Sequence, residues 1–191
     1  MKRTLIIIFK TILFTAGFIS AIYIFFPWRE AGNFAMSIAH SQLQRRGMRL
    51  NYSDVSGTEG GFSVDNLTLS GMSDISMSSI TITPQIITSI LSISPVCRIT
   101  FKGASVRLGQ TIRLGDGEFL LTAGREILLE DMHTDGEFSL DGYMTVDTSS
   151  MKIGRAEAKL KVPETFAPNM NMLKNFLPLV QDNGTWYLRR K

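Results

Sequence analysis

Acidic residues and a histidine lie close together between Asp131 and Glu137. This stretch overlaps the second of the two copies of Asp-Gly-Glu-Phe in the chain. In the stretch EDMHTDGE, Asp131, His133, Asp135 and Glu137 are spaced two apart, so an unbroken strand would place them on one face. Carboxylates and an imidazole on one face are a donor set that suits a metal ion. The spacing therefore raises the hypothesis of a metal site.

The same acidic residues also suit the turns of a β-sheet. Asp116-Gly117, Asp135-Gly136 and Asp141-Gly142 are flanked by strand-like runs, and Asp-Gly readily adopts the positive φ angles of tight hairpins. The spacing of the two Asp-Gly-Glu-Phe copies accommodates one strand out, a turn at AGRE and one strand back. A turn at Asp135-Gly136 would break the shared face, so we favour hairpin turns and predict no metal ligands.

Signatures of catalysis and of nucleic-acid binding are missing from the sequence. There is no G-x-S-x-G elbow, phosphate-binding glycine loop or H-E-x-x-H helix, and two histidines and one cysteine leave few nucleophile and base combinations. Cys97 lies in an alternating apolar run, and His40 has no metal-binding neighbour at helical spacing, so both are predicted to be structural. The net charge of +3 comes without interleaved aromatic and basic residues. We predict no enzyme activity, no catalytic residue, no cofactor and no nucleic-acid partner.

An apolar segment near the amino terminus predicts a membrane anchor. From Leu5 to Phe26 the chain is apolar apart from Lys10 and small hydroxyl residues, and as a helix it would extend roughly 33 Å, enough for a hydrocarbon core of about 30 Å. No small-residue cleavage pattern follows it, which favours an uncleaved helix over a signal peptide. Lys2 and Arg3 predict a cytoplasmic amino terminus. The predicted anchor residues are Leu5, Ile8, Phe9, Leu13, Phe14, Phe18, Ile22, Phe26 and, at the opposite interface, Trp28.

The chain is therefore divided into a cytoplasmic tip with its anchor (1–28), a membrane-proximal amphipathic helix (29–47) and a β domain (48–191). In the amphipathic helix, Gly47 is placed to end the helix. This helix either caps the β domain or lies along the lipid surface, and capping is the default. Its predicted apolar positions are Ala31, Phe34, Ala35, Ile38, Ala39 and Leu43.

After Met48 the hydrophobic period changes to two, which predicts a sheet with one dry and one wet face. The clearest case is AEAKLKV, in which Ala156 to Val162 alternates with charged residues. The predicted apolar inner face includes Phe62, Val64, Ile99, Phe101, Phe119, Phe138, Leu140 and Leu160.

The alternation changes parity in three places, at 64–67, at 77–80 and across Gly154, which predicts β-bulges and a curved sheet. Two apolar stretches bounded by prolines, 84–95 and 168–178, predict short buried helices that close an end or edge of the sheet. The final GTWYLRR predicts a last strand. The expected fold is mainly β: a transmembrane helix, then a curved, bulged antiparallel sheet, either a β-groove or an open, barrel-like or jelly-roll-like form, with short capping helices.

The order of these features resembles the type II secretion system protein N family and its AsmA-like relatives. The resemblance lies in the anchor ending FPW, the helix ending LQRRG, the strand GGFSVDNLTLSG, and ITITPQIITSILSISPVCRITFKGASVRL, where a strand leads to a short isoleucine-rich helix and returns as a strand. It implies a single-pass inner-membrane protein with a periplasmic β domain and other secretion or envelope proteins as partners.

Two functions remain open at this stage. The first is an assembly or structural subunit whose strands pair with partners by β-addition. The second, implied by the AsmA-like resemblance, is an AsmA-like or lipopolysaccharide-transport-like module for lipid binding or transfer, whose apolar face forms a groove for acyl chains.

Overall fold

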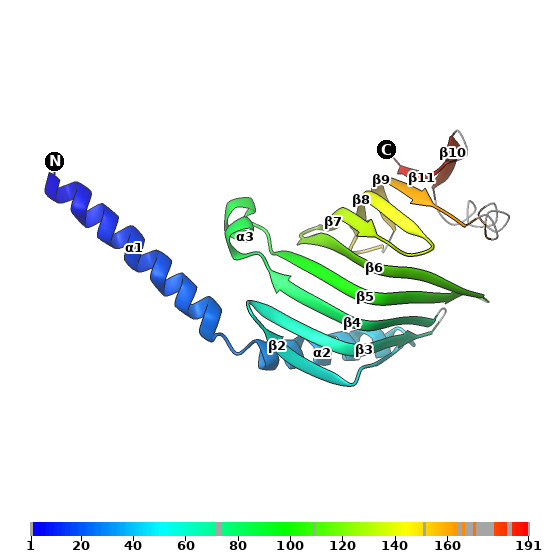
Figure 1. Cartoon of the computed structure of the whole chain (residues 1–191), viewed down its shortest axis with the longest axis horizontal. Coiled ribbons are helices and arrows are strands. Elements are labelled where there is room, and N and C mark those ends of the chain that lie inside the picture. Colours follow the sequence, from blue (N-terminus) through cyan, green and yellow to red (C-terminus); the bar gives the residue numbers. More distant parts are fainter. Residues whose placement is uncertain are drawn as a thin grey trace.

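The computed structural model describes residues 2–71, 74–108, 110–150, 152–163, 166, 170, 178–182 and 185–190. Two helices begin the chain, a third interrupts the strands, and the remainder is β-structure (Figure 1). The helices are α1 (Lys2–Phe25), α2 (Trp28–Arg45) and α3 (Ile86–Ser92). The strands are β1 (Arg49–Asn51), β2 (Asp54–Thr58), β3 (Gly61–Ser70), β4 (Asp74–Pro84), β5 (Val96–Leu108), β6 (Gln110–Ala123), β7 (Glu126–Thr134), β8 (Ser139–Asp147), β9 (Ile153–Lys161), β10 (Leu179–Asp182) and β11 (Thr185–Arg190).

The strands form one 11-stranded antiparallel sheet in the order β1-β3-β4-β5-β6-β7-β8-β9-β11-β10, with β2 also pairing with β3. From β3 to β9 each strand lies beside the next one in the chain, so the sheet is a meander. The mainly β, open antiparallel fold is confirmed, and the jelly-roll-like alternative is wrong because no long crossover joins these strands. The strand predicted from GTWYLRR is β11.

Alternation along the strands gives the sheet its apolar inner face. On β9, Ala156 and Ala158 are buried while Glu157 and Lys159 are exposed, as the sequence predicts. Two groups of buried side chains cover this face. One group lies between α2 and the first strands: Met36, Leu50, Val55, Phe62 and Val64. The other combines residues of the later strands with two residues that follow β9, Phe166 and Met170. Its strand residues are Ile112, Met132, Ala156, Ala158, Leu179, Trp186 and Leu188.

A row of irregular positions crosses β3 to β6 and accounts for the first two changes of parity. Asn66 has φ +49°, and neither it nor Ser78 opposite belongs to the ladder, although the register before and after them is the same. The parity therefore changes on both strands together, where a two-against-one bulge was expected. Gly103 (φ +59°) and Gly115 (φ +73°) continue this row, which we call the first irregular row, into β5 and β6.

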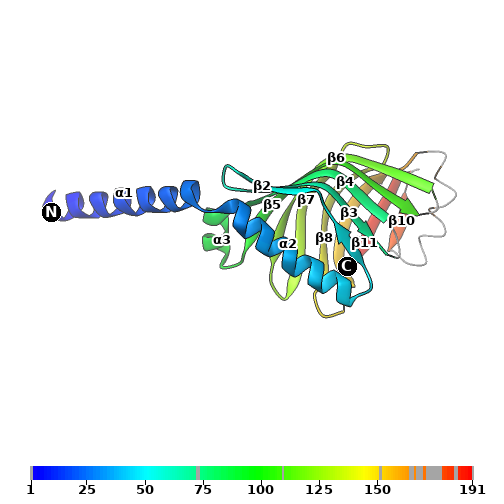
Figure 2. The ribbon, with the colours of Figure 1, turned by 90° about the horizontal axis from the view of Figure 1, so that it is seen from below.

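A second irregular row crosses β6 to β8. The register shifts beside Phe119 and again around Asp131, whose φ is +50°. The third predicted parity change is confirmed as a register shift between β8 and β9, where the Oγ1 of Thr145 accepts a hydrogen bond of 2.8 Å from the backbone N–H of Arg155. Because such irregularities bend and twist a sheet, they explain the curl visible in Figure 2.

The Asp-Gly pairs correct the turn prediction. Only Asp135-Gly136 connects two strands, β7 and β8. Asp116-Gly117 lies inside β6 and Asp141-Gly142 inside β8, so the prediction of turns there is wrong. The turn at AGRE is confirmed between β6 and β7. A local preference for positive φ serves an irregular ladder position as well as a hairpin, and Gly115 and Gly142 (φ +148°) use it in this way.

Helix α2 packs on the inner face of β1–β4, and this arrangement agrees with the capping alternative. Gly47 (φ +74°) follows the helix end as predicted. The buried stripe differs from the predicted one: Gly32 and Met36 are buried with Ala39 and Leu43 beside them, while Phe34 and Ile38 are 69% and 47% exposed. The predicted face is therefore wrong in part.

The proline-bounded stretch 168–178 lies largely outside the described residues, including the four positions that suggested its helix: Met172, Leu173, Phe176 and Leu177. Among the described helices, none alone combines the length and the hydropathy that crossing a membrane requires. Both criteria are met by a pair of segments, Phe9–Phe25 and Trp28–Arg45, which are bent by 65° relative to each other.

Candidate functional site

Of the residues that raised the metal hypothesis, His133 lies on the outer face of β7 and Asp131 is exposed on the same strand, whereas Asp135 and Glu137 lie in the turn between β7 and β8. The ring Nδ1 of His133 lies 2.5 Å from Oδ1 of Asp141 on the neighbouring strand, and their side chains are 59% and 53% exposed. The hydrogen bond to Asp141 and its negative charge raise the pKa of His133 above 6.5, with smaller contributions from Asp135 and Glu118. This is a charge pair in open solvent.

The two repeated aspartates bond to backbone groups at the first irregular row. Oδ1 of Asp116 accepts a hydrogen bond of 2.9 Å from the N–H of Gly103, and Oδ1 of Asp135 accepts one of 2.7 Å from the N–H of Asp116. An irregular ladder leaves amides without their usual strand partner, and a carboxylate is a strong acceptor for them. These acids therefore serve the backbone of the sheet.

Within the part of the chain that the structure describes, no three His, Cys, Asp or Glu side chains are placed to hold a metal ion. Asp131 and His133 are both exposed, but Asp135 belongs to the turn that follows β7. Cys97 lies on β5 opposite Leu121, away from His133, and burial raises the pKa of its thiol.

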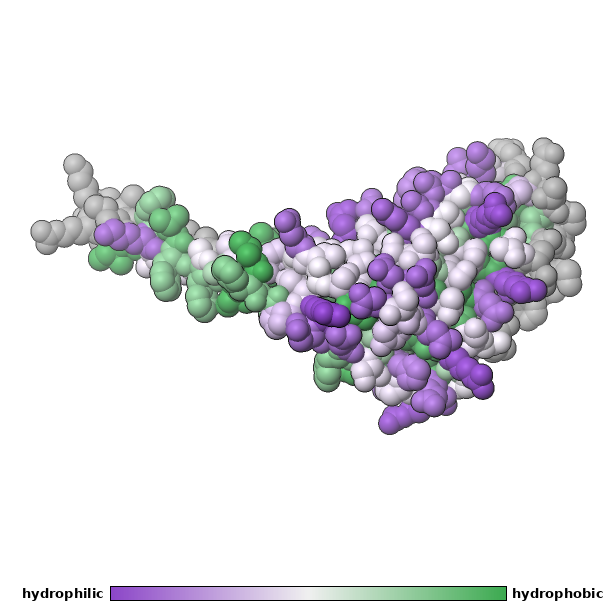
Figure 3. Space-filling view, turned by 60° about the horizontal axis from the view of Figure 1, so that its bottom comes forward, coloured by the Kyte–Doolittle hydropathy of each residue, from purple (hydrophilic) through white to green (hydrophobic). Residues whose placement is uncertain are grey.

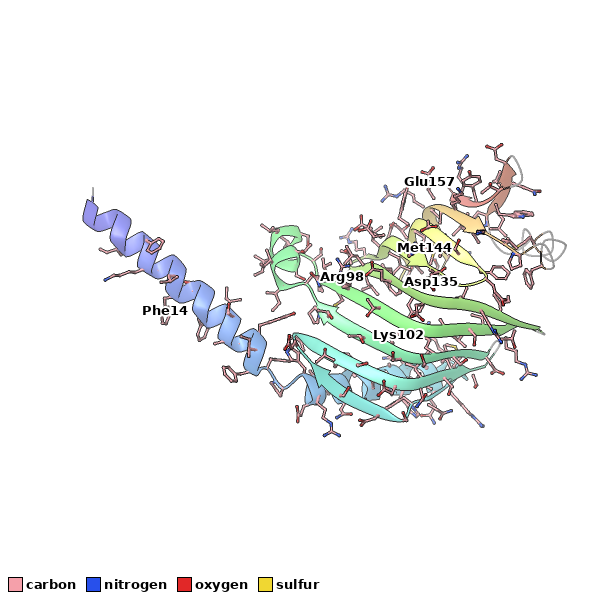
Figure 4. The ribbon with its side chains drawn as sticks, in the orientation of Figure 1. Phe14, Arg98, Lys102, Asp135, Met144 and Glu157 are labelled. Carbon is pink, nitrogen blue, oxygen red and sulfur yellow. The ribbon has the colours of Figure 1, made fainter. Side chains whose placement is uncertain are left out.

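The predicted inner-face residues lie on the apolar side of the sheet. Phe62, Val64, Ile99 and Phe101 are at most 8% exposed. The four others are partly buried and pack against the buried group of the later strands: Phe119, Phe138, Leu140 and Leu160. Arg98, by contrast, points to the outer face and pairs with Glu118 at 3.1 Å. Figure 4 shows Arg98 and Lys102 on the same strand, with Asp135 nearby.

The connection from β4 to β5, residues 84–95, forms what we call the apolar turn. It contains α3 as predicted, but the prediction that this helix is buried is wrong, because none of its residues is buried. The exposed fractions are 74% for Ile87, 64% for Ile90, 80% for Leu91 and 91% for Ile93. A cluster of this size on a surface indicates a contact with something apolar.

Ser89 holds the apolar turn to the sheet. Its Oγ donates to the carbonyl of Gln85 at 2.7 Å and accepts from the N–H of Val96 at 2.8 Å. The helix ends at Ile93, which has φ +55°, a conformation that a β-branched residue rarely adopts. This left-handed conformation ends the helix, and the N–H of Ile93 donates to the carbonyl of Ser89.

The apolar turn lies beside the carboxyl-terminal part of α1 (Figures 1 and 2). A cavity of about 380 Å³ between them is lined by Ile19, Ser20, Tyr23 and Ile24 of α1 and by 84–88. Trp28 fixes the junction, since its indole N–H donates to the carbonyl of Tyr23 at 2.9 Å and its ring contacts those of Tyr23 and Phe26.

The predicted anchor residues of α1 stand away from the rest of the molecule. Phe9, Leu13, Phe14, Phe18, Ile22 and Phe26 are between 42% and 76% exposed, and the side chains of Leu5 and Ile8 are outside the described part. Figure 3 shows hydrophobic residues along this helix and mostly hydrophilic ones over the visible face of the sheet, and in Figure 4 Phe14 projects into open space. Helix α1 and the apolar turn thus form one apolar end of the molecule.

Sequence reasoning found the apolar turn but not its exposure. A signal was present: the stretch from Pro84 to Pro95 contains no charged residue. A capping helix at the rim of a soluble sheet would ordinarily turn at least one charged side chain to water.

A family model described as type II secretion system protein GspN-like, Synergistales, matches residues 5–190. Comparison with curated proteins and with solved structures gave no match.

Proposed function

The chain belongs to the GspN-like family of type II secretion system proteins, and from this premise we propose that it is a membrane-anchored, non-enzymatic assembly subunit of that system. The observation that carries the proposal is the match over residues 5–190, which includes both the apolar helix and the whole sheet. Membership in the family indicates a component of the secretion system. The physical features described next support membrane anchoring and an assembly role.

Helix α1 is proposed to be the single-pass anchor in the inner membrane. From Lys2 to Phe25 its 24 residues extend about 36 Å, which exceeds the hydrocarbon thickness of about 30 Å, although in the described residues the criteria for a span are met only together with α2. Lys2 and Arg3 favour a cytoplasmic amino terminus, which places the sheet in the periplasm. Thr11 and Thr15 bond to the carbonyls four residues earlier, at 3.0 and 2.9 Å, so their hydroxyl groups are compatible with lipid.

The absence of enzyme activity is part of the proposal. The outer-face pair of His133 and Asp141 is open to solvent, whereas a general base that works by a shifted pKa is normally desolvated. The carboxylates of Asp116 and Asp135 are already bonded to backbone amides. The acidic segment is thus explained by the architecture of the sheet.

We propose that the sheet acts through its edges. Strand β10 has a strand neighbour on one side only among the described residues, and Val180 on it is 44% exposed. The opposite edge is partly covered, because Nε of Arg29 on α2 donates to the carbonyl of Val55 on β2 at 3.1 Å. β-addition at the β10 edge would use backbone hydrogen bonds and needs no chemistry from side chains.

The test is site-specific photo-crosslinking of the full chain in native membranes. A photoreactive residue at Val180 should yield adducts with type II secretion components, and the same residue at Glu157, on the outer face away from the edge, should not. Recovery of no secretion component from Val180 would contradict an assembly role at this edge.

Lipid binding on the inner face is the alternative, and burial of Phe62, Val64, Ile99 and Phe101 argues for a filled face there. A photoreactive residue at the partly buried Phe119 distinguishes the two functions. Adducts with phospholipid at Phe119, detected by mass spectrometry, would favour the lipid-transfer alternative.

A further inference from the structure

We propose that the apolar turn, residues 84–95, inserts into the phospholipid bilayer beside α1 and gives the protein a second membrane contact. The inference rests on the proposed anchoring of α1. It starts from the four large apolar side chains that the turn exposes, each between 64% and 91%: Ile87, Ile90, Leu91 and Ile93.

The depth of the turn agrees with insertion. It flanks α1 from Ile19 to Ile24 across the cavity between them. Ile19 lies six residues before the helix end at Phe25, which corresponds to about 9 Å along the axis. Interfacial segments bury their apolar side chains about 5–10 Å into the boundary between headgroups and acyl chains. If α1 spans the bilayer, the turn lies in its periplasmic leaflet.

The composition of the turn suits lipid as well. It carries no charged residue, and Oγ of Ser89 bonds to the carbonyl of Gln85 and Oγ of Ser92 to that of Thr88 at 2.7 and 2.8 Å. Polar groups satisfied within their own segment can leave water at low cost. The side chain of Ile93, after the helix, is 91% exposed, which an aqueous surface would not favour for a large apolar residue.

The bilayer is the occupant that the structure favours, because the exposed surface of the turn is continuous with that of α1. Phe18, Ile22 and Ile24 are 58%, 49% and 69% exposed at the same end. One medium then covers both surfaces. Two contacts of this kind would hold the sheet over the membrane at two points, at the junction with α1 and at the apolar turn.

The experiment measures label depth in the full chain reconstituted into phospholipid nanodiscs. Cys97→Ala removes the native thiol, and single cysteines at Leu91, Phe18 and Glu157 each carry an environment-sensitive fluorophore. Glu157 lies at the far end of the sheet from α1 (Figure 4). Quenching by lipids with a nitroxide near the headgroup should be at least about threefold stronger at Leu91 than at Glu157, as expected for interfacial burial. Phe18, one residue before Ile19 on α1, should be quenched more strongly by a nitroxide in the acyl chain than by one near the headgroup.

Each outcome bears on a different claim. A water-exposed label at Leu91 together with a quenched label at Phe18 would overturn the second contact, leave the anchor intact, and assign the turn to a protein partner. A water-exposed label at Phe18 would overturn the anchor itself. Adding Ile90→Asp to the labelled Leu91→Cys chain should reduce its quenching by at least about half, because a charged side chain resists insertion. Ile90 is 64% exposed, so this change leaves the buried groups untouched.

Discussion

The close approach of α2 to the sheet at Gly32 gives a quantitative test of the fold. A Cβ added at Gly32 would lie 2.7 Å from Cδ2 and Cγ of Phe62 and 2.8 Å from Cγ1 of Val55. These distances are shorter than carbon atoms tolerate, and both neighbours are at most 7% exposed, so neither has free space to move into. Gly32→Ala therefore sets two effects against each other.

The first effect is favourable, since alanine is better than glycine in a helix by about 1 kcal/mol. The second is overpacking, which costs about 1–3 kcal/mol. Because the clash involves two buried side chains, we expect the cost near the upper end and a net loss of about 1–2 kcal/mol. A domain of this size would then melt about 2–8 °C lower.

The measurement is thermal unfolding of the full chain in detergent, followed by circular dichroism of the sheet. Asn33→Ala is the matched control, because Asn33 is exposed on the same helix and its replacement gains helix propensity without a clash. Phe62→Leu, combined with Gly32→Ala, should recover part of the loss by making room for the methyl group. A Gly32→Ala protein at least as stable as the wild type would refute the packing of α2 described above.

Three further predictions concern individual hydrogen bonds. Thr145→Val should lower the free energy of unfolding by about 1–3 kcal/mol in denaturant titrations, because it leaves the N–H of Arg155 at the bulge without its acceptor. The pKa of His133 measured by NMR should exceed 6.5 and fall in Asp141→Asn. The contribution of the His133–Asp141 pair to stability should be complete below pH 6.5 and disappear as the pH rises through the folded-state pKa of His133. Asp147, whose pKa the Ser149 and Ser150 hydroxyl and N–H groups lower from 3.8 to about 2, should contribute stability above pH 3.8 that is lost as the pH falls toward 2, and Asp147→Ala should abolish that dependence.

The sequence predicts the sheet well wherever one face is dry and the other wet. The alternation in 156–162 identifies β9 because each side chain there faces either the core or the solvent. The parity changes predict the irregular positions on β3 and β4 and the shift beside Gly154 for the same reason, but they did not indicate the second irregular row across β6 to β8. What alternation does not give is the partner strand, so it did not distinguish a two-against-one bulge from the matched irregularity at Asn66 and Ser78.

Local chemistry misleads where one residue pair suits two structures. Asp-Gly suits a hairpin and also the interior of an irregular strand, as at Gly142 (φ +148°), and only the pairing of β5 with β6 shows that Asp116 is internal. The stripe of α2 was misplaced for a related reason. Glycine contributes no hydrophobic signal, yet Gly32 marks the face that packs most closely. The exposure of α3 was missed although the absence of charged residues from Pro84 to Pro95 was a signal for it.

The irregular rows also have a mechanical consequence for the proposed membrane contacts. They curl the sheet, so α2 and the two buried residues Phe166 and Met170 lie against separate parts of its inner face. The β4–β5 ladder nevertheless keeps one register from Pro84 and Cys97 to Asp74 and Arg107. The apolar turn is therefore mounted on a long, continuously registered hairpin. A membrane contact made at its tip would be transmitted to the whole sheet, in addition to the connection through α1, the junction at Trp28 and α2.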